Sequence, residues 1–149
     1  MTTQDKAAIF WEAFDKLIRA FSYVNNVSGN VALGKLDIIA LETVSNGEGL
    51  IMSELARILD IRGNTTTGIV DRLAERKLWK RERHQGDRRE TRLYLTERGR
   101  KTVMAYQSQR ARFFREMMGA LTKTEQDGFV SVMVKIAGVM DSKKSEMAR

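Results

Sequence analysis

The feature that most constrains the fold is the stretch from residue 53 to residue 96, where two short amphipathic segments precede two strand-like runs. Ser53 is a good N-cap and predicts the start of the first helix. The apolar side chains of this first helix recur with helical spacing over a few turns: Leu55, Ala56, Ile58 and Leu59. A second helix, to about residue 77, follows from the i, i+3, i+4, i+7 spacing of one buried face. That face consists of Thr66, Ile69, Val70 and Leu73.

Between these segments, Arg62, Gly63 and Asn64 interrupt the periodicity. Gly63 predicts the turn, and Asn64 predicts the N-cap of the second helix. Two short helices joined by a tight turn form a helix-turn-helix, whose second helix lies in the major groove of DNA.

The strand-like runs at residues 78–83 and 91–95 flank the turn Gln85-Gly86-Asp87-Arg88-Arg89. This pattern predicts a β-hairpin with arginines at its tip, which is a wing. The short apolar run 50–52 is suited to a third strand beside that hairpin.

Charge is concentrated in the same region. Residues 72–101 hold twelve Lys and Arg against five acids, a net charge of +7 that equals the net charge of the whole chain. A concentrated basic surface is expected of a protein that neutralises phosphates. Solvated basic hairpins are also common. The basic wing indicates DNA binding because it directly follows a helix-turn-helix.

The chain resembles the MarR family of winged helix-turn-helix transcription regulators. The resemblance lies in Asp71-Arg72-Leu73, the Asp87-Arg88-Arg89 turn and the closing Leu95-Thr96-Glu97-Arg98-Gly99, in their order and spacing. It extends over nearly all of the chain, with two departures. Family members often have arginine where this chain has Gly68, and glycine where it has Lys77. The departure at Lys77 suggests a different ending for the recognition helix.

The resemblance implies a mainly α (α+β) fold, a winged helix-turn-helix with a helical dimerisation layer. It implies that Arg89 enters the minor groove, with Asp87 as its ordering carboxylate. It also implies a pocket for a small aromatic or phenolic effector between the two layers. Side chains of suitable type are Trp11, Phe14, Ile38, Tyr106 and Arg110, with Arg110 available for an anionic ligand. The alternative is core packing with a surface arginine.

The chain ends are predicted to be long amphipathic helices, at residues 3–27, 97–120 and 123 onward, with another helix at 34–45. Thr96 is the expected cap of one, and Thr122 with Glu125 forms a capping box for the last. One small winged module cannot cover all these apolar faces, so we expect helices from two protomers to interdigitate. An intramolecular bundle is the alternative. We therefore expect one domain, residues 1–149, with dimerisation helices at 1–33 and 100–149 and the DNA-binding part at 34–99.

The buried stripe of the second helix determines which residues point toward DNA. The expected contacts are Ser53, Asn64, Thr65, Thr67 and Arg72, with Arg88 and Arg89 from the wing. Asn64 has the alternative of being only an N-cap. Asp71 and Glu75 would be repelled by phosphates, so we expect them to pair with Arg72 or with wing arginines. Gly68 either lets the backbone approach DNA closely or is tolerated on an exposed face.

Composition and motifs argue against other classes of function. Cysteine is absent, which excludes a disulfide framework and a thiol switch. Proline is also absent, where average usage would give about seven, as fits long helices. No nucleophile with a base, phosphate loop or metal spacing is present, and the single histidine, His84, is expected to be a solvated wing residue. We therefore expect no enzyme, cofactor or metal.

The charged N-terminus is not that of a signal peptide, and no apolar run reaches the ~18 residues of a membrane span. The sequence thus predicts a cytoplasmic, ligand-responsive repressor that binds a palindromic operator as a homodimer. The alternative is an architectural protein that coats DNA without regard to sequence.

Overall fold

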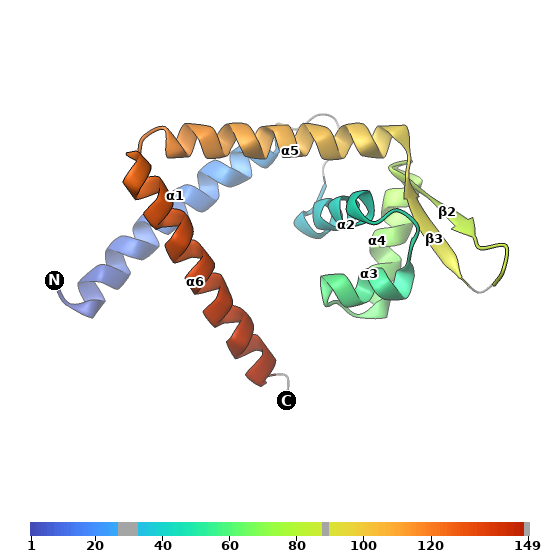
Figure 1. Cartoon of the computed structure of the whole chain (residues 1–149), viewed down its shortest axis with the longest axis horizontal. Coiled ribbons are helices and arrows are strands. Elements are labelled where there is room, and N and C mark those ends of the chain that lie inside the picture. Colours follow the sequence, from blue (N-terminus) through green and yellow to red (C-terminus); the bar gives the residue numbers. More distant parts are fainter. Residues whose placement is uncertain (27–32, 88–89, 148–149) are drawn as a thin grey trace. The chain divides into compact units, whose positions relative to one another are not determined.

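The computed structural model describes residues 1–26, 33–87 and 90–147. Within them the elements follow one another as six helices and three short strands (Figure 1). In chain order these are α1 (Thr3–Asn26), α2 (Lys35–Asn46), β1 (Leu50–Ile51), α3 (Met52–Leu59), α4 (Gly63–Glu75), β2 (Trp79–Arg83), β3 (Thr91–Leu95), α5 (Glu97–Met118) and α6 (Lys123–Met147). The helix-turn-helix is α3 and α4, and the wing is β2 and β3, as the sequence predicts.

The sheet is antiparallel with strand order β1-β3-β2. The hairpin register pairs Trp79 with Leu95 at its base and Arg83 with Thr91 near its tip. The predicted third strand is confirmed, because Leu50 of β1 pairs with Leu93 of β3.

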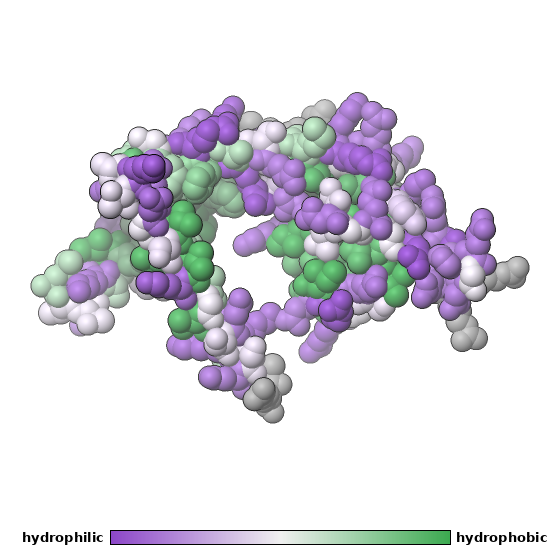
Figure 2. Space-filling model, viewed as in Figure 1, coloured by the Kyte–Doolittle hydropathy of each residue, from purple (hydrophilic) through white to green (hydrophobic). Residues whose placement is uncertain are grey.

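The core of the winged module lies among α2, α3, α4 and the sheet. Its fully buried side chains include Leu41, Leu55, Leu73, Leu78, Trp79, Leu93 and Leu95. The indole of Trp79 also donates a 2.9 Å hydrogen bond to the carbonyl of Val70, so burying it leaves no unpaired donor. Figure 2 shows that hydrophilic side chains cover the wing outside this core.

The beginning of α5 is tied to the end of the helix-turn-helix. Thr96 caps α5 as predicted, because its hydroxyl accepts a 3.0 Å hydrogen bond from the Gly99 amide. The Thr96 amide in turn donates to the Leu78 carbonyl at 3.1 Å. This contact requires glycine at position 99, because a Cβ there would lie 1.9 Å from the Leu78 carbonyl oxygen.

The structure corrects both predicted N-caps of the helix-turn-helix. The N-cap of α3 is Ile51, two residues earlier than expected, and the Glu54 carboxylate accepts a hydrogen bond from the Ile51 amide at 3.1 Å. Ser53 therefore lies in the first turn. The N-cap of α4 is Arg62, and Gly63 is already helical. Asn64 lies in the first turn, where its side-chain oxygen accepts the Thr65 amide at 2.9 Å.

Both helices of the motif end in a left-handed residue. The chain turns after α3 at Asp60 (φ 52°), and after α4 at Lys77 (φ 57°). The Lys77 amide donates to the Ala74 carbonyl at 2.9 Å, and the Leu78 amide to the Leu73 carbonyl at 3.0 Å. This pair of bonds is the Schellman motif, in which glycine is usual at the left-handed position. The expectation of a different ending at Lys77 is thus wrong, because the glycine-type ending forms with lysine in place.

The chain separates into two compact units, Met1–Gln109 and Arg110–Arg149. In the first unit, α1 exposes large apolar side chains, including Ile9, Phe10, Trp11, Phe14, Leu17 and Ile18. In the second unit, Thr122 and Glu125 form the predicted capping box. The hydrogen bonds from Thr122 lower the pKa of Glu125. Within its described span, α6 buries none of its residues. None of the helices in the described residues is long and apolar enough to cross a membrane.

Candidate nucleic-acid interface

The N-terminal half of α4 presents short, uncharged polar side chains to its surroundings. Asn64, Thr65 and Thr67 are exposed, whereas Thr66 is buried beside Ile69, as the helical periodicity predicts. The Thr67 hydroxyl donates a 3.0 Å hydrogen bond to the Gly63 carbonyl, so its oxygen is left as an acceptor and its methyl group as an apolar contact. In a helix-turn-helix these are the positions that reach base edges.

Arg72, a predicted DNA contact, makes a two-point ion pair with Asp37 at the start of α2. Its Nε donates to one carboxylate oxygen at 3.3 Å, and its Nη2 donates to the other. Asp37 is only 3% exposed and also accepts the Gly34 amide at 3.0 Å. The hydrogen bonding that Arg72 donates to the Asp37 carboxylate raises the pKa of Arg72. The guanidinium thus joins α2 to α4, and contact between Arg72 and DNA stays a prediction.

Asp37 is a residue that sequence reasoning missed. It lies 35 positions before Arg72, so no local spacing connects the two residues. A weaker signal was present, because Asp37 stands three residues after Gly34, where a carboxylate completes the capping of a helix.

The neighbouring Asp71 fixes α4 on a second side. Its carboxylate lies 2.9 Å from Nη2 of Arg81 on β2. This confirms the expectation that Asp71 pairs with a wing arginine. The recognition helix is therefore connected by one ion pair to α2 and by another to the wing.

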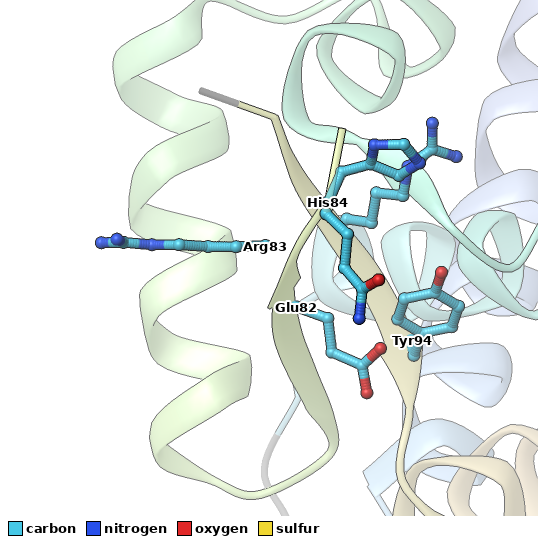
Figure 3. A pocket seen from close by; sticks show the side chains of 6 residues that line it. Glu82, Arg83, His84 and Tyr94 are labelled. Carbon is cyan, nitrogen blue, oxygen red and sulfur yellow. The ribbon is translucent and has the colours of Figure 1, made fainter. Parts of the chain in front are cut away.

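The wing places its polar side chains on alternating faces, as the two-residue period of a strand requires. Figure 3 shows Glu82, His84 and Tyr94 on one side of the hairpin and Arg83 extending from the other. A hollow of about 310 Å³ lies here, lined by Glu82, Arg83, His84, Gln85, Arg92 and Tyr94. His84 is exposed, as expected, and its Nδ1 accepts the Gly86 amide at 3.1 Å.

The tip arginines Arg88 and Arg89 lie outside the described residues. Asp87 is exposed, and its backbone carbonyl accepts the Glu90 amide at 3.1 Å. The minor-groove role of Arg89 and the ordering role of Asp87 remain predictions.

The five side chains expected at an effector pocket are distributed over both compact units. Trp11 and Phe14 belong to an aromatic group on α1, in which Phe10 stacks on Phe14 with ring centroids 5.4 Å apart. Ile38 is half-buried on α2, and Tyr106 is 8% exposed on α5. Arg110 falls in the second unit and is exposed. The pocket remains a prediction.

The described part of the chain contains no group of three or more His, Cys, Asp or Glu residues placed to hold a metal ion.

Comparison with known proteins finds the same architecture in transcription regulators. The PcaV regulator of Streptomyces coelicolor, solved with its natural ligand, is 21% identical with a TM-score of 0.67, covering 93% of this chain and 98% of that one. FabT of Streptococcus pneumoniae, solved in complex with DNA, is 14% identical with a TM-score of 0.79, covering 95% and 99%. YusO of Bacillus subtilis is 18% identical with a TM-score of 0.74, covering 93% and 99%.

No curated protein sequence matches the chain. A sequence model of the MarR family, however, matches residues 33–90, which run from the residues before α2 to the tip of the wing. This match covers the helix-turn-helix, both residues of the Asp71–Arg81 pair and the turn with its arginines. Residues 33–90 are therefore similar in sequence to the MarR family, and the chain shares the winged-helix fold of these transcription regulators.

Proposed function

We propose that this chain is a MarR-family repressor that binds a palindromic operator as a homodimer and releases it when a small effector binds. The observation that carries the proposal is the recognition helix. α4 exposes Asn64, Thr65 and Thr67 at its N-terminal half, while ion pairs from Asp71 and Arg72 hold it to the wing and to α2. A helix held in this way can present the same side chains to the same bases at each encounter.

Two exposed apolar faces support the homodimer. The aromatic group of α1 and the stripe of α6 that contains Val132, Met133, Ile136 and Met140 are largely exposed in the single chain. Contiguous apolar surface of this kind marks an interface. A two-fold dimer would bring two copies of α4 to half-sites about 34 Å apart on one face of the duplex.

The effector would act on the spacing of the two recognition helices. A ligand shifts a conformational equilibrium only if it binds one state better than the other. We propose that it favours a dimer whose helices no longer match the half-site spacing. PcaV, which shares the fold, has been solved with its natural ligand, and FabT with DNA; both cases support a regulator of this type.

The test is selection of bound duplexes from a random-sequence library at near-physiological salt. The expected product is a two-fold symmetric consensus whose half-site centres are one helical turn apart. It should bind at least about a thousandfold more tightly than random DNA, the lower end of the range for specific sites. As a control, the Thr67→Ala variant should select a weaker consensus.

A second function stays open because one observation favours it. Both charged side chains in the middle of α4 are engaged in ion pairs, and the N-terminal half of the helix, residues 63–68, offers bases only neutral groups. A DNA-coating protein with a basic wing would show the same feature. It would yield no consensus from the library and would bind all duplexes with similar affinity, which is the outcome that would replace the operator-binding proposal.

A further inference from the structure

Gly68 occupies an unusual place in the recognition helix. It lies within α4, at an exposed position on the helix face opposite the buried residues Thr66 and Val70. Glycine is the least favourable residue inside a helix after proline. A Cβ built at Gly68 would have no atom of the chain within 4 Å, so packing does not require glycine here. In the folded chain, Gly68 therefore leaves open space on the surface of the helix.

This open space lies beside the part of α4 that is expected to face DNA. On a helix, residues three and four positions earlier are neighbours, and for Gly68 these are Thr65 and Asn64. Both are exposed in the half of α4 that reaches base edges. The next charged groups, Asp71 and Arg72, are engaged with Arg81 and Asp37. The space over Gly68 is therefore bordered by short neutral side chains.

The major groove offers few groups that suit such a space. Guanine is read chiefly by arginine or lysine, which donate to two acceptors at once. Within Gly63–Glu75, all of which the structure describes, the single cation is Arg72 and it is engaged with Asp37. Thymine instead projects a methyl group into the groove, which is read by apolar contact, for example with the methyl of threonine.

We propose that the space over Gly68 receives a thymine methyl group, so that each half-site carries an A·T pair beneath the middle of α4. This inference rests on the proposed function and names the base chemistry that the helix recognises. A side chain at position 68 would occupy the volume that the methyl group needs. The glycine thus serves base selection.

The test removes the methyl group from the DNA and adds one to the protein. Each thymine of the selected consensus is replaced in turn by deoxyuridine, which pairs identically but lacks the methyl group. One such replacement, made in both half-sites, should weaken wild-type binding about fifteenfold, since each of the two buried methyl groups contributes about fourfold. Gly68→Ala places a methyl group in the same space. That variant should bind the thymine and deoxyuridine duplexes within about twofold of each other.

Gly63→Ala is the matched control, because Gly63 lies in the same helix and its Cβ would also meet nothing within 4 Å. It should retain the wild-type preference for thymine. A consensus with G·C beneath α4, or a Gly68→Ala variant that still prefers thymine, overturns this inference and leaves the operator-binding proposal standing. A library selection without any consensus overturns both.

Discussion

At the scale of single residues, the neighbours of Gly99 leave no room for a side chain. A Cβ at this position would lie 1.9 Å from the Leu78 carbonyl oxygen, which itself accepts the Thr96 amide. To relieve this clash, the start of α5 would have to move away from the end of the helix-turn-helix. We expect Gly99→Ala to lower the free energy of unfolding by about 1–3 kcal/mol, the range of overpacked sites.

Urea unfolding followed by circular dichroism measures this loss. The matched control is Gly68→Ala, which introduces the same methyl group in open space. It should raise the free energy of unfolding by about 0.5–1 kcal/mol, the difference in helix propensity. Equal effects of the two substitutions would show that the Leu78 contact does not constrain position 99.

Lys77 offers the opposite case, a residue whose backbone is strained. Its φ of 57° lies in the left-handed region, which costs a residue with a side chain about 1–2 kcal/mol. Lys77→Gly should therefore stabilise the fold by about 1 kcal/mol and raise the melting temperature. Glu75→Gly, two positions earlier inside α4, should instead destabilise by a similar amount. A destabilised Lys77→Gly variant would contradict this account of the helix ending.

These residues also show where sequence reasoning stops. The buried face of α4 could be predicted because its period is local. The N-caps could not, because Ser53 and Asn64 have suitable side chains but each N-cap lies two residues earlier, at Ile51 and Arg62. Glu54 caps α3 from inside the helix, so a competing hydrogen bond decided the boundary.

At the scale of elements, the hairpin and its third strand could be predicted from strand-like runs and a turn. Of the two ion pairs that hold α4, only one could be predicted from the sequence. Asp71 was expected to find a wing arginine, and it pairs with Arg81. The partner of Arg72 on α2 depends on tertiary packing, which brings residues 35 positions apart into contact.

The wing and the recognition helix should contribute differently to binding. Arg89→Ala removes a cation from the segment that holds all the net charge of the chain. The minor groove carries little sequence information, so binding to operator and random DNA should weaken alike. The slope of log affinity against log salt should flatten by up to about 0.9 per phosphate charge no longer neutralised in each protomer.

Thr67→Ala is the contrasting variant, because it removes a short polar side chain and no charge. The salt slope should be unchanged, while discrimination between operator and random DNA falls. Fluorescence anisotropy titrations over a range of salt concentrations measure both quantities. A steeper loss of discrimination in Arg89→Ala than in Thr67→Ala would reverse the assigned roles.

At the scale of the whole molecule, the helices at the chain ends expose large apolar side chains. α6 buries none of its residues in the described chain, and its exposed side chains include Met133 (50% exposed) and Ile136 (48% exposed). Leaving such surface in water forfeits about 25 cal/mol per Å² of apolar area. A second copy of the chain would cover it, and two-fold symmetry would match a palindromic operator.

We therefore expect a homodimer of twice the 17.0 kDa chain mass in sedimentation at micromolar concentration. Met133→Lys with Ile136→Lys should shift the equilibrium toward the monomer, because two charges would be desolvated at the interface. Ser131→Lys, on the opposite side of α6, is the control and should remain dimeric. The double variant should also lose operator affinity while its binding to random DNA falls less, since each wing keeps its charge. A wild-type chain that sediments at 17 kDa would mean that the apolar faces are covered within one chain, by the intramolecular bundle.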